Sequence, residues 1–366
     1  MGESDAVFQF GAPVLAVCGF SGSGKTTLLE AVIPRLVERG LAVAVVKHDA
    51  HGFEVDKPGK DSDRFFRAGA TVALSGPGQQ FERRGAGAVL SLSTMLARLG
   101  CEHDVVLVEG HKDIALPKLW LSSEERQQAP ESVTNILRTL RWNADRVTDF
   151  MEFVYAWLPS AWTGRPLYGG MLVGGMSSRM GSAKQLMRFG ESTMGEIVAG
   201  ALGGALGAER CVALGAGELP AALSGYVKLP DPPGFGGPAA ALIAAHRWCP
   251  EAAWIVAACD HPWLRAEQIR WLVSHRQATR WAVIPQQRDG RAYPMLALYE
   301  PQALEALERM ACDAPERARP AVLLDSPRTF LAEVPVELMD GWKNVNTPEE
   351  LQMEETRLQG SGELAE

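Results

Sequence analysis

Two glycine-rich loops in this chain of 366 residues have the residue types and the spacing that bind polyphosphates. The first reads Gly-Phe-Ser-Gly-Ser-Gly-Lys-Thr from Gly19 to Thr26, and the second reads Leu-Val-Gly-Gly-Met-Ser-Ser-Arg-Met-Gly-Ser-Ala-Lys from Leu172 to Lys184. Each follows an apolar run and precedes a helix-compatible stretch, so backbone N–H groups and a lysine can surround phosphate oxygens. Two such loops so far apart predict two nucleotide sites on two separately folded domains.

The first loop matches the P-loop pattern completely. Its glycines allow the backbone to curl until several N–H groups converge on phosphate oxygens. Lys25 can reach the terminal phosphates, and the hydroxyl of Thr26 can ligate Mg²⁺. The predicted nucleotide-binding residues of this loop are Gly19, Gly22, Gly24, Lys25, Thr26 and Thr27.

Polar residues follow two apolar runs of the first half, where strands of a parallel sheet would end. Glu109 follows the run from Val105 to Val108, and we predict that it lies beside Thr26 at the metal. The residues from Lys47 to Asp49 follow another run, and could lie at the same edge or in a solvated loop. The charged segment from Asp56 to Arg67 could be a mobile loop over the phosphates or an ordinary solvated loop and helix face.

The second loop lacks the P-loop spacing but carries two cationic side chains. Gly174 and Gly175 would lie close to a nucleotide. Arg179 and Lys184 would neutralise the charge that builds on the phosphates as a bond to the α-phosphorus forms. Arginine offers a planar fork and lysine a point charge, so the two are not interchangeable. The competing interpretation is a basic helix start after a glycine turn.

Two aspartates of the second half are candidate partners of this loop. Asp260 closely follows the apolar run from Trp254 to Ala258, and we predict that it holds the Mg²⁺ that bridges the α-phosphate and the attacking group. Asp231 opens a glycine–proline turn that continues to Pro238. Its carboxylate could pair with the donors on a guanine edge, or the turn could be a plain loop.

Apolar runs that alternate with helical patterns predict the fold class, which is α/β. Runs that are apolar on both faces indicate parallel sheets between helix layers, so we expect two three-layer α/β domains. A helix is expected from Thr26 to Arg39, with Pro34 kinking it or ending it early. The predicted strands are Pro13 to Cys18, Leu41 to Val46, Val105 to Val108, Tyr168 to Val173, Trp254 to Ala258, Trp281 to Ile284 and Tyr293 to Leu298.

The boundary between the halves is predicted from a change in pattern. The periodic signal weakens over residues 116–165, which we interpret as a divergent linking region with a junction near Pro159 to Pro166. The predicted units are a first domain at residues 1–160, a second domain at residues 166–352 and a flexible tail at residues 353–366.

Composition excludes several classes of protein. A net charge of −8 argues against a general nucleic-acid binder, which needs a basic surface. Six cysteines are scattered without a Cys-x-x-Cys pair, as suits a reducing compartment. We recognise no secretory signal, and no apolar stretch approaches the roughly 18 residues that span a bilayer. We therefore predict a cytoplasmic protein with neither a membrane nor a nucleic-acid partner.

The first half resembles the MobB family, the GTP-binding adaptor of molybdopterin-guanine dinucleotide biosynthesis. The resemblance covers roughly Pro13 to Leu119, and it implies a P-loop NTPase-like fold that binds GTP with slow or negligible hydrolysis. The segments that carry it are the P-loop, Lys47 to Asp49, Asp61 to Arg64 before a Phe-x-x-Ala-Gly-Ala helix, and Val108 to Lys112.

The second half resembles the MobA family, the molybdenum cofactor guanylyltransferases, over roughly Leu167 to Leu351. The resemblance implies a Rossmann-like nucleotidyltransferase fold of the nucleotide-diphospho-sugar transferase type. It is carried by the second loop, Asp231 to Pro238, Ala258 to Pro262, Tyr293-Pro294, and Asn344 to Pro348. It implies nucleotide contacts from Leu172, Val173, Gly174 and Lys184, a base contact from Asp231, Mg²⁺ at Asp260, and Asn346 near the pterin phosphate or the metal.

The chain also departs from the MobA pattern at two places. Ala183 stands where the family often has an aspartate before the lysine. The segment from Val212 to Glu218 lacks the asparagine expected after the second strand. These departures concern the base contacts and the second substrate.

Together the resemblances predict a molybdenum cofactor guanylyltransferase fused to a GTP-binding adaptor. Molybdopterin phosphate would attack the α-phosphorus of GTP in line and release pyrophosphate, with Arg179, Lys184 and Asp260 as catalytic residues. Mg²⁺ is the predicted cofactor, GTP and molybdopterin are the predicted ligands, and molybdoenzyme apoproteins or their chaperones are candidate partners. Two alternatives stay open, namely cytidylyl transfer to the same cofactor and a non-catalytic carrier of nucleotide or cofactor.

Overall fold

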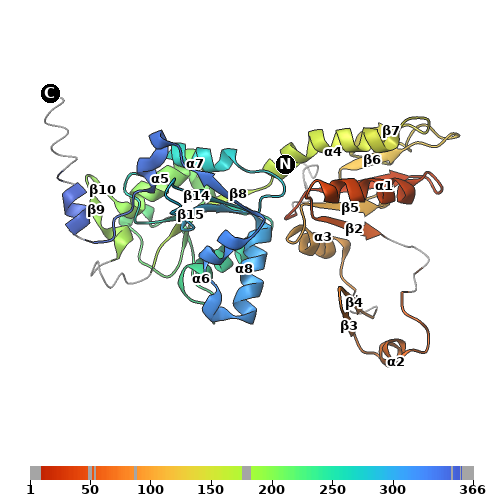
Figure 1. Ribbon diagram of the computed structural model, residues 1–366, viewed down its shortest axis with the longest axis horizontal. Coiled ribbons are helices and arrows are strands. Elements are labelled where there is room, and N and C mark those ends of the chain that lie inside the picture. Colours follow the sequence, from red (N-terminus) through yellow and green to blue (C-terminus); the bar gives the residue numbers. More distant parts are fainter. Residues whose placement is uncertain are drawn as a thin grey trace.

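Buried aliphatic strands form the centres of two α/β domains, which lie end to end along the longest axis of the molecule (Figure 1). The computed structural model describes residues 10–47, 52, 55–85, 89–174, 183–347, 349–354 and 356. The last helix of the first domain ends at Thr163, and the first strand of the second domain begins at Leu167. We propose to place the division at residues 164–166. The predicted tail lies almost entirely outside the described residues.

The first domain is built on a five-stranded parallel sheet in the order β2-β5-β1-β6-β7. Helices α1 (Lys25–Glu38) and α4 (Arg146–Thr163) pack on one face, and α3 (Leu92–Gly100) packs on the other. Because both faces are covered, the central strands can be apolar at nearly every position. The strands are β1 (Val14–Gly19), β2 (Val43–Lys47), β5 (Val105–Glu109), β6 (Lys118–Leu121) and β7 (Ile136–Leu140).

The strands expected in the first half are confirmed as β1, β2 and β5, with ends that differ by one or two residues. The expected helix is α1, but the expectation that Pro34 could end it early is wrong, since α1 continues to Glu38. Leu36 lies beyond the proline and is completely buried in the core. Its burial offsets the single backbone hydrogen bond that a proline removes.

The segment at residues 116–165, where the sequence pattern is weak, contains β6, β7 and α4. All four residues of β6 are buried, and α4 contributes Phe150 and Val154 to the core. Lys118 on β6 is also fully buried. Its ammonium group donates to the carbonyl oxygens of Ile114, of Leu116 at 3.0 Å and of Thr134 at 3.1 Å. The segment therefore completes the first domain.

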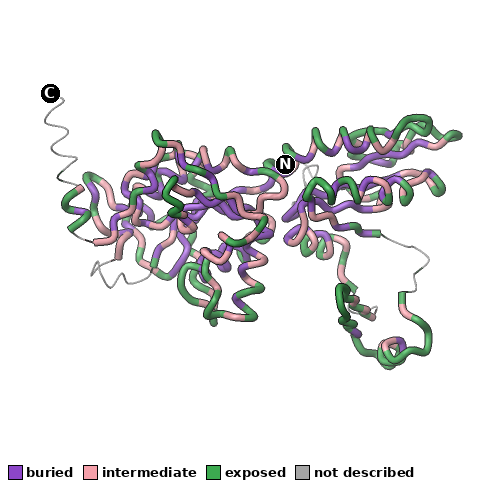
Figure 2. The backbone as a smooth tube through the Cα atoms, viewed as in Figure 1, coloured by how far each residue is buried: buried purple, intermediate pink, exposed green. Residues whose placement is uncertain are grey.

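An arm at residues 55–85 stands away from this domain (Figure 1) and is largely exposed (Figure 2). It contains α2 (Asp61–Arg67) and a hairpin of β3 (Val72–Gly76) and β4 (Gln79–Arg83). The buried carboxylate of Asp63 accepts hydrogen bonds from the backbone of Gly59 and from two arginine side chains. Residues 56–67 therefore form a short loop followed by the helix α2.

The second domain is built on a seven-stranded sheet in the order β12-β11-β8-β13-β15-β14-β16, in which only β15 is antiparallel. Helices α5 (Met194–Leu206) and α7 (Ala266–Ser274) cover one face, and α6 (Gly237–Trp248) and α8 (Pro301–Asp313) cover the other. The strands are β8 (Leu167–Leu172), β11 (Cys211–Leu214), β12 (Val227–Leu229), β13 (Ala253–Ala258), β14 (Ala282–Gln286), β15 (Leu296–Tyr299) and β16 (Thr329–Glu333). A short ribbon and 3₁₀ turns complete it, namely β9 (Arg188–Phe189), β10 (Ser192–Thr193), η2 (Lys184–Leu186), η3 (Ala208–Arg210), η4 (Ala221–Leu223), η5 (Pro315–Arg317), η6 (Pro320–Asp325) and η7 (Val336–Trp342).

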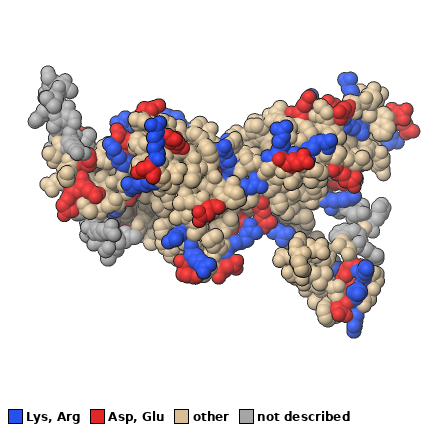
Figure 3. Space-filling model, viewed as in Figure 1, with Lys and Arg blue, Asp and Glu red and all other residues tan. Residues whose placement is uncertain are grey.

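The strands expected in the second half are confirmed as β8, β13, β14 and β15. β15 begins at Leu296, later than expected, because Tyr293 and Pro294 form a turn closed by a 3.1 Å bond from the Leu296 N–H to the Tyr293 carbonyl. Across the described residues, no helix combines the length and the apolar character needed to cross a membrane. On the face shown in Figure 3, acidic and basic side chains are interspersed over both domains.

The buried position of Lys118 leads to a prediction for stability. Replacing it by methionine (Lys118→Met) should lower the free energy of unfolding by about 2–3 kcal/mol, because three backbone carbonyls lose a charged donor inside the protein. Urea unfolding measures this change, and Lys112→Met serves as the control because Lys112 is exposed. Equal stability of the two variants would show that the carbonyls around Lys118 find other donors.

Candidate functional site

The first glycine loop is a tight turn between β1 and α1. Gly22 and Gly24 have φ values of 74° and 86°, which glycine adopts without steric cost. A Cβ atom on Gly19 would lie 2.5 Å from the hydroxyl of Ser23, so only glycine fits there. The ammonium group of Lys25 donates to the carbonyls of Gly19 at 3.2 Å and Phe20 at 2.9 Å, and so lies over the hollow of the loop.

Strand register brings a carboxylate to this loop. β1 and β5 pair in parallel with Val17 opposite Glu109, which places Glu109 at the edge where the loop begins. The hydroxyl of Thr26 donates to one carboxylate oxygen of Glu109 at 3.0 Å, and the ammonium group of Lys47 lies 3.7 Å from the other. The predicted pair is thus brought together. Thr27 follows in the first turn of α1 with an exposed side chain, and residues 48 and 49 lie outside the described residues.

The oxygens of Thr26 and Glu109 fit a magnesium ion. Mg²⁺ prefers hard oxygen ligands, and beside a polyphosphate it takes only one or two from protein while phosphates and water supply the rest. No group of three or more histidine, cysteine, aspartate or glutamate side chains is arranged to hold a metal within the described ranges. The pair could therefore hold the ion only together with a bound nucleotide.

Two arginines that the sequence did not point to support the loop from outside. Arg146, the first residue of α4, donates from its guanidinium group to the carbonyl of Ser23 at 2.7 Å and also to that of Ser122. The guanidinium group of Arg126 lies 4.8 Å from the ring centre of Phe20. A cation at a helix N-terminus opposes the helix dipole, but the start of α4 was not predicted from the sequence, so Arg146 did not stand out there.

The second glycine loop opens a cavity of about 660 Å³ at the carboxyl ends of β8, β11 and β13. Most of the residues predicted for this site line it. Gly175 and Arg179 lie outside the described residues. The lining residues are Leu172, Val173, Gly174, Lys184, Gln185, Leu214, Gly215, Ala216, Gly217, Asp231, Gly237, Pro238, Ala241, Ala258, Cys259, Asp260 and Met295.

Lys184 and Asp260 line this cavity, and a third predicted polar side chain, that of Asn346, contacts Lys184. The ammonium group of Lys184 lies 3.0 Å from a carboxylate oxygen of Asp260 and donates to the side-chain oxygen of Asn346 at 3.2 Å. The backbone of Val345 donates to the Asp260 carbonyl at 2.9 Å, which fixes the segment that carries Asn346. The carboxylate of Asp260 and the amide oxygen of Asn346 are ligands that suit Mg²⁺.

His261 lies beside this cluster but does not neutralise it. Its Nε2 atom is 3.4 Å from the second carboxylate oxygen of Asp260. Burial lowers the pKa of His261 below the ordinary histidine value, so the ring is neutral near neutral pH. Lys184 is therefore the cation that balances the charge of Asp260 in the described part of the site.

Close packing of glycine backbone shapes the floor of the cavity. A Cβ atom on Gly215 would lie 2.0 Å from the Val173 carbonyl oxygen, and one on Gly217 would lie 2.8 Å from the Gly174 nitrogen. The side chain of Gln185 donates to the Glu218 carbonyl at 2.9 Å and holds the same turn. This glycine turn occupies the segment in which the expected asparagine is absent. The glycines of this turn follow no binding motif, so the turn could not be predicted from the sequence.

Asp231 lies at the rim of the cavity, before the start of α6. Its side chain remains open to solvent, and desolvation by the surrounding protein raises its pKa above the ordinary aspartate value. A carboxylate at a cavity rim can accept from two parallel N–H groups of a ligand. The geometry is thus compatible with the predicted base contact.

Fold and site together define a chain with a P-loop domain and a nucleotidyltransferase domain. Residues 14–140 match the family described as molybdopterin guanine dinucleotide synthesis protein B, and residues 169–326 match a MobA-like NTP transferase domain. The chain therefore belongs to the MobB family through its first domain and carries a MobA-like NTP transferase domain as its second. Both predicted resemblances are confirmed.

Individual relatives match one half or the other. The molybdopterin-guanine dinucleotide biosynthesis adapter protein of Haemophilus influenzae is 33% identical over 176 residues, which are 40% of this chain and 89% of that protein. A protein of Pelotomaculum thermopropionicum named "Probable molybdenum cofactor guanylyltransferase" is 29% identical over 190 residues, which are 50% of this chain and 89% of that protein.

Solved structures also match each half. The molybdopterin-guanine dinucleotide biosynthesis protein A of Archaeoglobus fulgidus has a TM-score of 0.42 at 22% identity, with 53% of this chain and 99% of that chain covered. A MobB homologue of Bacillus stearothermophilus has a TM-score of 0.31 at 25% identity, with 39% of this chain and 98% of that chain covered.

The contact between Thr26 and Glu109 leads to a prediction for metal-dependent binding. Glu109→Gln should weaken the binding of GTP to the first domain about tenfold or more when Mg²⁺ is present, because an amide is a poorer ligand for the ion. Titration calorimetry with and without EDTA measures this effect, and the exposed Glu124→Gln is the matched control. A loss of the same size in EDTA would show that Glu109 acts through its protein contacts instead.

Proposed function

We propose that the second domain transfers GMP from GTP to the phosphate of molybdopterin and releases pyrophosphate. The observation that carries this proposal is that Lys184, which lines a glycine-rich cavity, contacts Asp260 at 3.0 Å and Asn346 at 3.2 Å. The MobA-like domain match and the guanylyltransferase relative support it. In the reaction a pterin phosphate oxygen forms a bond to the α-phosphorus, and the bond from that phosphorus to the bridging oxygen of pyrophosphate breaks.

The residues of the loop and of β13 have distinct roles in this proposal. Backbone N–H groups from Val173 onward would hold the phosphates, and Lys184 would offset the charge that develops around the α-phosphorus. Arg179, which lies outside the described residues, stays a predicted catalytic residue for the same charge. Because a phosphate nucleophile is already ionised near neutral pH, the site needs no general base. Neutral His261 is consistent with that requirement.

Asp260 and Asn346 would hold the magnesium ion of this site. When bound, Mg²⁺ supplies Lewis-acid stabilisation of the transferred phosphoryl group. Asp260 already faces Lys184, so the carboxylate and the ammonium group are oriented toward one point of the cavity. Asp260 and Lys184 would position the attacked phosphorus between a metal-binding carboxylate and a cation.

We further propose that the first domain holds GTP as an adaptor, with Mg²⁺ between Thr26 and Glu109. The adapter-protein relatives support a place for this domain in the same cofactor pathway. Molybdoenzyme apoproteins or their chaperones are the candidate partners, because a finished dinucleotide must reach such a protein.

The direct test of the transfer reaction uses the full chain with molybdopterin, Mg²⁺ and each nucleoside triphosphate in turn. Dinucleotide product and pyrophosphate are measured together. GTP should give both, and CTP should give little of either. Product from CTP in preference to GTP would replace guanylyl by cytidylyl transfer. Nucleotide binding without pyrophosphate release would indicate a carrier.

Asp260 provides the mutational test. Asp260→Asn should lower the rate of transfer by about 10²–10³-fold, because the metal and the developing charge lose an ionised partner. The rate of pyrophosphate release measures this loss, and Asp313→Asn, an exposed aspartate at the end of α8, is the control. Transfer at the normal rate in Asp260→Asn with Mg²⁺ would remove this residue from the mechanism.

Asp231 provides a test of base recognition through inosine triphosphate, which lacks the exocyclic amine of guanine. The unmodified protein should prefer GTP over ITP by about tenfold or more in kcat/KM, and Asp231→Asn should lose most of this preference. Asp325→Asn, which is exposed and distant from the cavity in sequence, serves as control.

The same carboxylate predicts a dependence on pH. Because the pKa of Asp231 is raised, the guanine contact is present above that pKa and is lost as the pH falls through it, at a higher pH than for an ordinary aspartate. The preference for GTP over ITP should therefore decline on acidification. A preference that stays constant with pH would assign base recognition to other groups.

A further inference from the structure

The two domains meet through the amino ends of their strands. On the side of the first domain, Gly11, Ala42 and Asp104 lie just before β1, β2 and β5. On the side of the second domain, contacts come from residues before β8, β14 and β16, and from the end of the antiparallel β15. We call this contact the junction, and it is formed by Asp104, Arg165, Arg276, Glu300, Gln302 and Arg328.

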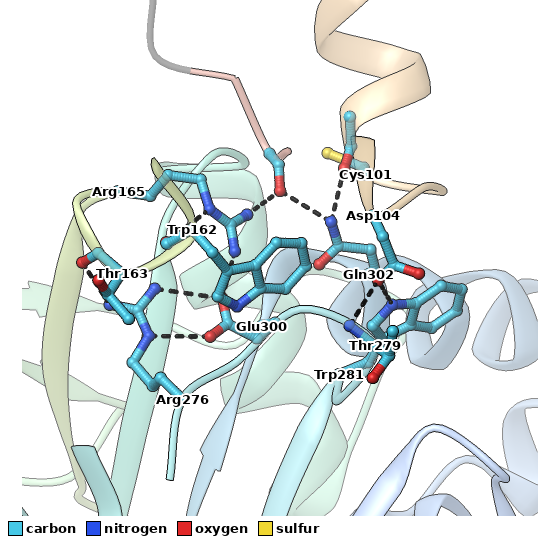
Figure 4. A network of polar contacts seen from close by, with 12 residues as sticks. Cys101, Asp104, Trp162, Thr163, Arg165, Arg276, Thr279, Trp281, Glu300 and Gln302 are labelled. Carbon is cyan, nitrogen blue, oxygen red and sulfur yellow. Dashed lines mark hydrogen bonds and ion pairs between the residues drawn. The ribbon is translucent and has the colours of Figure 1, made fainter. Parts of the chain in front are cut away.

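The carboxylate of Glu300 pairs with two arginines that also contact the first domain (Figure 4). Its carboxylate is completely buried and accepts from Arg165 at 2.9 Å and from Arg276 at 2.8 Å and 3.2 Å. The same guanidinium groups donate to carbonyls of the first domain, Arg165 to Gly11 and Arg276 to Thr163 at 3.2 Å. A buried carboxylate between two buried cations is stable only when every group is paired, which ties these side chains to one geometry.

Asp104 forms the reciprocal contact from the first domain (Figure 4). It is fully buried, and its carboxylate accepts from the backbone of Thr279 at 3.0 Å, the indole of Trp281 at 2.8 Å and the guanidinium of Arg328 at 3.1 Å. Thr279 has a φ of 73°, which a β-branched residue adopts only under strain. The second domain thus holds a strained backbone position that directs an N–H group at Asp104.

Gln302 completes the junction with three hydrogen-bond contacts to the first domain. Its amide nitrogen donates to the carbonyls of Gly11 at 2.8 Å, Gly100 at 2.8 Å and His103 at 2.9 Å, all in the first domain. Each domain therefore satisfies buried polar groups of the other. Such reciprocal pairing is typical of a permanent interface, because a separated domain would leave these groups without partners.

The phosphate-binding loops lie at the opposite ends of the same strands. The P-loop follows the carboxyl end of β1, and the second loop follows the carboxyl end of β8. We propose that the junction joins the domains back to back as one rigid body, so that the two nucleotide sites face away from each other. GTP held by the P-loop is then not passed to the transferase site of the same chain, and each site remains open to a different partner.

The expected separation follows from strand length. β1 and β8 have six residues each, and six strand residues span about 20 Å, so the two sites should be on the order of 40 Å apart. This proposal rests on the proposed function only in that it takes both loops as nucleotide sites. The geometry of the junction can be tested separately.

Pulsed electron spin resonance on the full chain, with a spin-labelled GTP in each site, measures that separation directly. We expect two nucleotides per chain and one narrow distance distribution near 40 Å or beyond. A distance under about 20 Å, or a broad distribution in the unmodified protein, would overturn the back-to-back arrangement while leaving the transferase proposal intact. A single bound nucleotide per chain, identified by calorimetric stoichiometry, would overturn the two-site arrangement, whereas the transfer assay tests the transferase proposal independently.

Junction variants test the cause of the rigidity. Glu300→Ala should broaden the distance distribution, and Gln302→Leu is the milder second variant should the first fail to fold. Arg309→Ala is the matched control, because its 3.3 Å pair with Glu102 also crosses the domains but is exposed. Gln302→Leu should broaden the distribution while the rate of transfer stays within about twofold of normal. An unchanged distribution in Gln302→Leu, or a transfer rate that falls tenfold with it, would refute the proposed role of the junction.

Discussion

Parallel pairing of the central strands is the constraint on which both sites depend. In each domain the phosphate-binding loop follows one strand, and its acidic partner follows the neighbouring parallel strand. Parallel strands end at the same edge of a sheet, so the strand register alone brings the loop and the carboxylate together. Register decides which side chain is presented, because a slip of one residue would turn Glu109, the last residue of β5, to the other face.

The opposite, amino ends of the strands lie where the two domains contact each other. The candidate ligand-binding groups lie at the carboxyl edges, whereas Asp104 and Glu300 lie at the amino edges and are buried between the domains. A carboxylate that is removed from water is costly unless it is fully paired. Each domain supplies the donors that the other needs, so neither half of the junction is complete alone.

Charge balance shapes the second site in a related way. Burial keeps His261 neutral, and Lys184 provides the positive charge opposite Asp260. An arriving phosphate would find a cation that is already placed by three oxygen partners, namely the side chains of Asp260 and Asn346 and the carbonyl of Val345. Side chains held in this way need little reorganisation when charge develops.

The sequence by itself determined the strands and the two loops, because apolar runs, glycines and a lysine at fixed spacing act over a few residues. It also singled out Glu109 and Asp260 as candidate metal ligands, since each comes at or just after the end of a buried apolar run. Only the tertiary structure showed that Arg146 supports the P-loop and that Gly215 packs against Val173. Only the tertiary structure also placed Asp104 against Trp281. These residues are 177 positions apart, and their contact depends on how the two folded domains pack together, which no periodic pattern in the sequence indicates.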